Sequence, residues 1–296
     1  MANMTNTAQI TQSLVNHDNC QINQVSLSEG IDTIEITHPR CKAIVSLYAG
    51  HVLSWQPTSE REVFWLSEAT KYAQGSAIRG GIPLCWPWFG PKAGEVNHGF
   101  TRTSIWQLDS VSSNDNGVSL ILTFSGESLA KTWPYRFKLT QTLFFGDVFK
   151  QTLKIDNLGE QAFEHSGALH SYFHVSQPEQ ACVPNLTNIP YYDKLTDSEK
   201  CTRLIDCRGP KDRVYKSNEA LALLDYGFNR KLVISTTGSQ DWVLWNPGQE
   251  VASSMSDIHP RGEQHFVCLE AGFTKPLTLA AGQSYEVSQE IAIQAI

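Results

Sequence analysis

Residues 136–157, RFKLTQTLFFGDVFKQTLKIDN, decide the fold class of this chain. Apolar and polar side chains alternate on both sides of Gly146-Asp147, and this pair supplies a turn. Period-two alternation is typical of strands that bury one face, whereas an amphipathic helix repeats about every 3.6 residues. The stretch therefore predicts a β-hairpin whose arms are residues 136–145 and 148–157.

The same alternation continues on both sides of this hairpin. A second hairpin joins IWQLDSV to VSLILTFSG through Asn116-Gly117, a pair that suits a tight turn. No long segment has a clear helical period. One strand follows another, with turn signals about every eight to twelve residues. This order predicts an all-β protein, either a sandwich or a barrel. Further expected strands are IDTIEIT, KAIVSLY, FEHSGALHSYFHVS, LALLDY, KLVISTT, WVLWNP, FVCLEAGF and YEVSQEIAI.

The domain organisation follows from the uniform composition. The 296 residues contain no linker, no fixed repeat and no shift in composition, so we expect a single domain over residues 21–296. Residues 1–20 are polar and are expected to form a loosely attached extension. This extension lacks the charged and apolar regions of a signal peptide.

Charge and cysteine content narrow the class of partner. The formal net charge is −7 and basic residues do not cluster, which argues against a nucleic-acid or anionic-membrane partner. No run approaches the roughly 20 apolar residues of a membrane helix. The seven cysteines show no CxxC spacing, so free thiols in a reducing compartment are the simplest interpretation. We expect a cytoplasmic protein that is a monomer or a weak oligomer.

The segment from Arg79 to Arg102, RGGIPLCWPWFGPKAGEVNHGFTR, is too rich in glycine, proline and tryptophan for a helix or an ordinary strand. It predicts a shaped loop that presents Arg79, His98 and Arg102 beside aromatic side chains. Such a set suits a small polar ligand with a negative group, for example a sugar phosphate. The alternative is a proline-rich surface loop whose aromatic residues only cover the core.

Two residues on apolar strands are candidates for chemistry. Glu270 lies in FVCLEAGF, where a buried carboxylate would be costly unless paired, although alternation alone also permits a glutamate that points to solvent. His170 lies in ALHSYFHV, where a core histidine bonded to the backbone is the alternative. His174 follows four residues later, about 13 Å away along a strand, so no metal site shared by the two histidines is expected.

Several motifs together resemble one family. RGGIP, HGF and CLEAG are specific as a set, and they occur in order with LHSYFHV, the Tyr191–Lys194 segment YYDK, and WNP. Over residues 25–293 the chain resembles the hexose-6-phosphate mutarotases, also called glucose-6-phosphate 1-epimerases, of the aldose 1-epimerase superfamily. One departure is Gly248, which follows WNP where the family usually carries an aromatic residue.

The resemblance implies a large antiparallel β-sandwich of the galactose-mutarotase type and an isomerase acting on a hexose 6-phosphate. It implies general acid/base catalysis by the pair His170 and Glu270, with no metal and no cofactor. The other site residues that it implies are His98 and Asp193 at the sugar and Arg79 and Arg102 near the phosphate.

Four other functions remain open at this point. A mutarotase could act on free hexoses, or a non-catalytic carbohydrate-binding protein could keep the aromatics and arginines without an acid/base pair. A glycosidase would need a second carboxyl group, Asp193 or Asp257, to reach the anomeric carbon. A purely structural sandwich that binds a partner protein would not respond to sugar phosphates.

Overall fold

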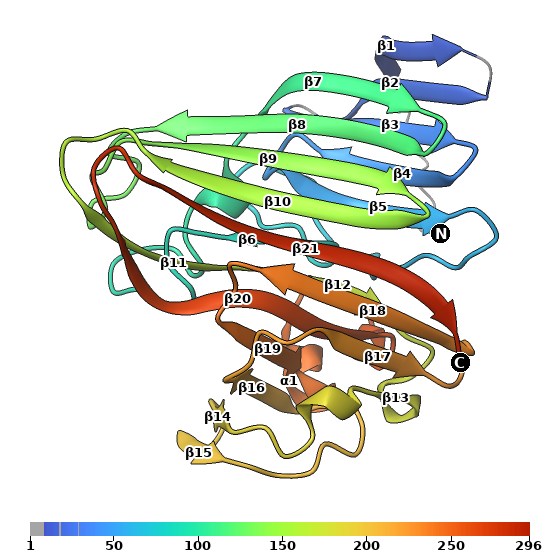
Figure 1. Ribbon diagram of the computed structural model, residues 1–296, viewed down its shortest axis with the longest axis vertical. Coiled ribbons are helices and arrows are strands. Elements are labelled where there is room, and N and C mark those ends of the chain that lie inside the picture. Colours follow the sequence, from blue (N-terminus) through green and yellow to red (C-terminus); the bar gives the residue numbers. More distant parts are fainter. Residues whose placement is uncertain (1–8, 18, 29) are drawn as a thin grey trace.

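The protein is described by a computed structural model that covers residues 9–17, 19–28 and 30–296 (Figure 1). Within these residues the strands form three antiparallel sheets, which confirms the all-β class. The only α-helix of this part of the chain is α1 (Gly248–Ser254), and none of its helices has the length and apolar character to cross a membrane. Short 3-10 turns are η1 (Thr101–Thr103), η2 (Pro178–Gln180), η3 (Pro184–Leu186) and η4 (Gly262–Gln264).

The first sheet contains the N-terminal strands in sequence order: β1 (Gln9–His17), β2 (Cys20–Ser28), β3 (Ile31–His38), β4 (Cys41–Ser46) and β5 (His51–Pro57). Strand β1 lies inside the segment that was expected to be a loosely attached extension. It pairs with β2, with His17 opposite Cys20, so the sheet begins before the expected domain boundary at residue 21. The part of the extension before Gln9 lies outside the described residues.

The second sheet contains the two hairpins expected from the sequence. Phe137 on one arm pairs with Asn157 on the other, and Phe145 pairs with Phe149 around the turn at Gly146, which confirms the first hairpin. The order of the sheet is β13 (Ala181–Cys182), β17 (Leu221–Asp225), β18 (Arg230–Thr237), β21 (Ser284–Ala295), β10 (Val148–Asn157), β9 (Phe137–Gly146), β8 (Gly117–Gly126) and β7 (Gln107–Asn114).

The third sheet carries the candidate site. Its order is β15 (Ser198–Lys200), β14 (Tyr191–Asp193), β16 (Lys211–Tyr215), β19 (Asp241–Asn246), β20 (Phe266–Leu279), β11 (Phe163–Leu169) and β6 (Leu84–Cys85), and β12 (Tyr172–His174) also pairs with β20. The expected single strand FEHSGALHSYFHVS is therefore two strands, with a break at His170-Ser171.

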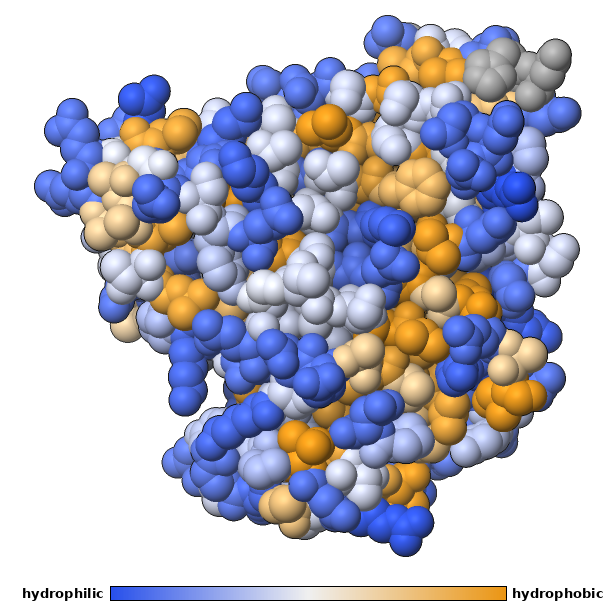
Figure 2. All heavy atoms as spheres, viewed as in Figure 1, coloured by the Kyte–Doolittle hydropathy of each residue, from blue (hydrophilic) through white to orange (hydrophobic). Residues whose placement is uncertain are grey.

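One continuous apolar core joins the three sheets. Ile36 from the first sheet, Leu143 from the second and Leu269 from the third belong to the same buried cluster. Trp55 and Phe149 tie the first two sheets together with ring centroids 5.6 Å apart. In the space-filling view, hydrophilic and apolar residues are interspersed over one face of the molecule (Figure 2). The shared core makes the third sheet a rigid platform for the side chains on its other face.

Most aromatic residues of the loop between Arg79 and Arg102 belong to this core. Trp86, Trp88 and Phe100 are buried, and Trp86 packs edge-on against Trp133 with centroids 4.9 Å apart. The structural interpretation of these aromatics is therefore correct. Arg79, His98 and Arg102 of the same loop line a polar cavity instead.

Candidate active site

A polar cavity of about 340 Å³ opens between the loop of residues 79–102 and the third sheet. Its size falls in the range of small-molecule sites, about 300–1,000 Å³. Of the six site residues expected from the sequence, five line this cavity: Arg79, His98, Arg102, His170 and Glu270. The structure thus brings together residues that are almost 200 positions apart in the chain.

Glu270 is held in the middle of β20. Its side chain is 1% exposed, so the alternative of a solvent-facing glutamate is wrong. Because side chains alternate along a strand, Cys268 and Glu270 share one face, and Val243 of β19 lies directly opposite Glu270. This face looks into the cavity, while Leu269 points to the core. The alternation of VCLEAG therefore places the carboxylate in the site.

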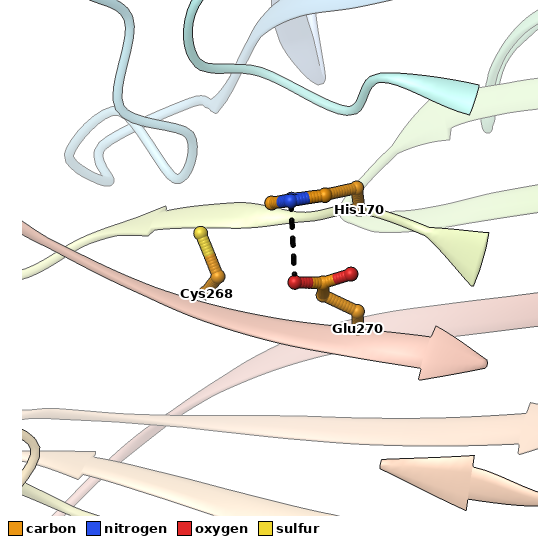
Figure 3. A group of neighbouring side chains, drawn as sticks. All are labelled: His170, Cys268 and Glu270. Carbon is orange, nitrogen blue, oxygen red and sulfur yellow. Dashed lines mark ion pairs between the residues drawn. The ribbon is translucent and has the colours of Figure 1, made fainter. Parts of the chain in front are cut away.

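His170 lies at the break between β11 and β12. Its backbone N–H donates to the carbonyl of Pro83 over 3.0 Å, which fixes the residue beside the RGGIP segment. Its ring stacks on Tyr172 with an interplanar angle of 11° and a centroid distance of 4.9 Å. Its Nε2 lies 3.3 Å from Oε1 of Glu270, as Figure 3 shows. His170 is therefore paired with Glu270, unlike a histidine bonded only to backbone groups.

Burial acts in opposite senses on the two members of this pair. It lowers the pKa of His170 well below its ordinary value, and His98, Arg79 and Arg102 lower it further. Burial also raises the pKa of Glu270 well above its ordinary value. Both shifts favour the form of the pair without net charge, in which a single proton is shared between Nε2 and Oε1.

His98 approaches the pair from the opposite wall. Its backbone has φ of 63°, and Gly99 after it has φ of 73°, where a Cβ would lie 1.9 Å from a backbone carbonyl oxygen. Its ring centroid is 5.9 Å from that of His170. Burial, then Arg102 and other cations, lowers the pKa of His98 to about 3, so the ring is neutral. Since Nδ1 accepts a hydrogen bond from the N–H of Gly90, the ring proton is on Nε2 and can be donated.

The two arginines have different partners. Arg79 donates to Asp257 through Nε and Nη2 at 3.0 and 2.9 Å and to the hydroxyl of Tyr172 through Nη1 at 2.7 Å. Arg102 donates through Nη2 to the carbonyl of Asn97 at 2.8 Å, and no carboxylate among the described residues forms an ion pair with it. Arg102 is therefore the arginine with spare capacity for an anion.

Asp193 does not line the cavity. Its carboxylate accepts a bond from Lys200 at 2.9 Å and one from the N–H of Leu195 at 3.0 Å. The next residue, Lys194, does line the cavity, where its ammonium lies 3.3 Å from Asp212. The sequence indicated the right segment, YYDK, but the family pattern pointed to its aspartate.

Lys194 and Asp212 are thus the charged residues of the cavity lining that sequence reasoning did not assign to the site. The Lys194 ammonium also lies 5.2 Å from the ring centroid of Phe89 in the loop of residues 79–102. Burial raises the pKa of Asp212. Both side chains reach the cavity because β14 and β16 pair within the third sheet. The irregular sequence of residues 176–218 does not predict that pairing.

The apolar wall of the cavity includes Trp245 of β19 and Met255 after α1. Gly248, the departure from the family pattern, begins α1 with φ of 69°, and a Cβ there would lie 2.8 Å from the backbone nitrogen of Pro210. The chain therefore requires a glycine at this position.

Comparison with known proteins identifies the family of this site. The profile described as "Aldose 1-epimerase" matches residues 32–292. The chain belongs to the aldose 1-epimerase family. A relative from Salmonella typhimurium, named "Putative glucose-6-phosphate 1-epimerase", is 35% identical over 273 residues, which cover 90% of this chain and 91% of that relative.

Solved structures of similar proteins agree with this membership. A crystal structure of a "putative mutarotase (YeaD)" from Salmonella typhimurium is 31% identical with a TM-score of 0.89 and covers 98% of this chain and 97% of that one. A galactose mutarotase-like protein from Clostridium acetobutylicum is 13% identical with a TM-score of 0.73, covers 95% of this chain and 100% of that one, and shows the same fold. The expected β-sandwich of the galactose-mutarotase type is confirmed.

One group of metal-ligand types lies inside the site of this family member. One ligand atom each from His170, Cys268 and Glu270 falls within 4.8 Å of the others, and all three residues are buried (Figure 3). Burial raises the pKa of the Cys268 thiol well above its ordinary value. This direction describes the metal-free site, since a metal ion would itself deprotonate a coordinating thiol.

Proposed function

We propose that the protein is a hexose-6-phosphate mutarotase that interconverts the α and β anomers of glucose 6-phosphate and similar aldohexose phosphates. The observation that carries the proposal is the buried contact between His170 and Glu270 at the base of a cavity lined by three cations, Arg79, Arg102 and Lys194. An acid/base pair supports ring opening, and the cations support recognition of a phosphate group. The names of the relatives, which refer to glucose 6-phosphate, agree with it.

Ring opening needs one base and one acid close together, because the C1 hydroxyl and the ring oxygen are bonded to the same carbon. Glu270 as a carboxylate takes the proton from the C1 hydroxyl, and protonated His170 gives its proton to the ring oxygen as the bond between C1 and that oxygen breaks. The open aldehyde rotates about C1–C2 and closes on the other face with both transfers reversed. Each transfer contributes on the order of 10²–10⁴-fold.

The proton inventory of the pair matches this cycle. Before ring opening the pair holds one proton, on His170; His170 gives it to the ring oxygen while Glu270 takes the proton of the C1 hydroxyl, so the pair holds one proton and has no net charge at either stage. In the free protein the opposite pKa shifts of the two groups also favour one proton on the pair, held by Glu270, and this proton moves to His170 before ring opening. A 3.3 Å contact between Nε2 and Oε1 allows the proton to change sides. His98 Nε2–H is positioned to donate to a sugar oxygen.

The phosphate is assigned to Arg102 and Lys194. Arg102 lacks a carboxylate partner in the described part of the chain, and a guanidinium offers bidentate, charge-assisted bonds to phosphate. Lys194, which follows β14 of the third sheet, adds a second positive charge to the cavity lining. Arg79 is already engaged by Asp257 and by the Tyr172 hydroxyl, so its main effect is on the residues around His170.

The catalytic assignment is tested by following exchange between the anomers of glucose 6-phosphate by NMR saturation transfer, with and without protein. His170→Ala and Glu270→Ala should abolish the catalysed exchange while the folded state persists. Full activity of either variant would overturn the roles assigned to the pair. Binding of glucose 6-phosphate without any acceleration by the wild-type protein would favour the carbohydrate-binding function instead.

The phosphate assignment is tested with a matched pair of arginine variants. Arg102→Ala should raise KM for glucose 6-phosphate by about 10-fold or more, as expected for a lost charged hydrogen bond, and leave activity on free glucose little changed. Arg79→Ala should lower activity on both sugars to a similar extent. Equal effects of Arg102→Ala on both sugars would remove Arg102 from the phosphate site and favour a mutarotase of free hexoses.

A glycosidase is less well supported. The two carboxylates named as its second group are both engaged elsewhere, Asp193 by Lys200 and Asp257 by Arg79. Release of the aglycone from an aryl hexoside by the wild-type protein would reopen that possibility.

A further inference from the structure

Four polar side chains cross the apolar core of the sandwich behind the candidate site. Gln141, Gln151, Gln289 and Ser171 are each at most 1% exposed. Burying an amide or a hydroxyl destabilises the folded state unless every polar atom finds a partner. Each of these four side chains forms a hydrogen bond with at least one of the others. Apolar packing alone does not explain why they lie together in the core.

The four side chains form a continuous hydrogen-bonded chain through three sheets. Gln141 of β9 donates to the carbonyl of Gly50 between β4 and β5 at 2.7 Å. Gln151 of β10 donates to Gln141 at 2.7 Å, and Gln289 of β21 donates to Gln151 at 2.7 Å. Gln289 and the Ser171 hydroxyl are 2.9–3.0 Å apart at the end of the chain. The chain therefore connects all three sheets and ends one residue from His170.

The end of the chain lies at the break between β11 and β12. The N–H of Ser171 bonds to the carbonyl of Leu169, only two residues away, and not to the neighbouring strand β20. The carbonyl of Ser171 accepts the N–H of Leu269, the residue before Glu270. His170 faces the cavity, while the Ser171 side chain meets Gln289 in the core. The hydrogen bond of the Ser171 side chain is therefore made at the point where the regular backbone pairing with β20 is interrupted.

We infer that Ser171 and Gln289 are positioning residues for the acid/base pair: their hydrogen bond through the core fixes the break that presents His170 to Glu270. This inference rests on the proposed function, because it assigns a task to the pair. The second sheet serves as the anchor, since Gln289 is bound on its other side by Gln151. Neither residue touches the cavity.

Ser171→Ala removes the hydroxyl with a minimal change of volume and leaves Gln289 unpaired on that side. The break can then shift, and small misplacements of reacting groups lower kcat by up to about 100-fold. We expect a 10- to 100-fold fall in kcat, roughly the effect of losing a group that orients a catalytic ligand, with KM for glucose 6-phosphate unchanged within about twofold. Ser171→Thr keeps the hydroxyl and should retain most of the activity.

A core variant outside the chain separates positioning from general stability. Ile291 lies on β21 two residues from Gln289, on the same buried face, and belongs to the main apolar core. Ile291→Val should lower the melting temperature without lowering kcat. If Ile291→Val reduces kcat as much as Ser171→Ala at equal loss of stability, the positioning role is refuted.

A second readout does not depend on activity. The N–H of Leu269 bonds to the carbonyl of Ser171, so its hydrogen exchange reports the state of the break. Ser171→Ala should accelerate exchange of this amide selectively, and Ile291→Val should not. Unchanged exchange together with wild-type kcat would overturn the inference even when His170→Ala is inactive, whereas a fully active His170→Ala would overturn the proposed function itself.

Discussion

Replacing Glu270 by glutamine should stabilise the protein while removing its activity, and the stabilisation should increase with pH. The change keeps the shape of the side chain and removes the ionisable group. Glu270 is 1% exposed, and its Oε2 has no hydrogen-bond partner. A carboxylate in such a place is poorly solvated, and this is why burial raises its pKa well above the ordinary value.

The magnitude follows from proton linkage. A glutamate in the unfolded chain titrates at about pH 4.3, and Glu270 in the folded protein titrates at higher pH. Between the two values the unfolded chain is ionised at this position and the folded chain is protonated. The contribution of Glu270 to stability is therefore present at low pH and is lost by about 1.4 kcal/mol per pH unit as the pH rises towards the folded pKa. Glutamine contributes no such slope.

The assay is urea unfolding of the wild type and of Glu270→Gln at several pH values from about 5 to about 8. The lowered pKa of His170 produces a slope of the opposite sign below about pH 6.5, and comparing the two proteins subtracts most of it. Glu127→Gln, at an exposed position, serves as the control for an ordinary carboxyl group. If the stability difference between the wild type and Glu270→Gln does not change with pH, the burial argument for Glu270 is wrong.

Three further predictions follow from the same geometry. Glucose 6-sulfate carries an ester that does not titrate near neutrality, so with this substrate the pH dependence of kcat/KM reports groups of the protein. The fall of kcat/KM at acid pH should have its midpoint below pH 6.5, about the ordinary pKa of histidine, because the second proton adds to His170, whose pKa is lowered. A midpoint at or above that value would contradict the assignment. His98→Ala should lower kcat/KM by about 10-fold, the effect of one lost hydrogen bond, whereas His98→Gln, which keeps an N–H donor, should lose less, and steady-state kinetics at neutral pH would reveal the difference. Gly81→Ala should destabilise the protein by more than about 1 kcal/mol, since Gly81 has φ of 61° and a Cβ would lie 2.2 Å from the carbonyl oxygen of Val52; an unchanged melting temperature would show that the turn can relax.

The fold class was accessible from the sequence because strand alternation is a local property. The hairpin of residues 136–157 formed with the expected register, since alternation and a turn at Gly146 determine it together. The pairing of β1 with β2 was missed because β1 is polar and its identity as a strand depends on its neighbour. The break at His170-Ser171 was also missed, since it is maintained by contacts with Gln289 and Pro83 that are distant in sequence.

The site was only partly accessible, and the family resemblance supplied what alternation could not. Alternation left the burial of Glu270 undecided, and the motif CLEAG selected it as catalytic. The motif YYDK led to Asp193, but the adjacent residue Lys194 lines the cavity. Lys194 is the first residue after β14 and lies in a turn, so strand alternation does not decide which of these two neighbouring side chains enters the cavity. Which face is turned to the cavity depends on tertiary packing.

The charges around the cavity favour one sugar reaction over another. Breaking a glycosidic bond proceeds through a sugar that resembles an oxocarbenium ion, and its positive charge would be repelled by Arg102, which has no carboxylate partner among the described residues. Opening a hemiacetal by the two proton transfers proposed here creates no net charge on the pair or the sugar ring, because each proton lost at one oxygen is replaced at the other. A buried site of low dielectric disfavours uncompensated charge, so the neutral proton exchange suits it. Arg102 and Lys194, to which the phosphate is assigned, attract that group at the far end of the substrate, where a negative charge is present throughout the reaction.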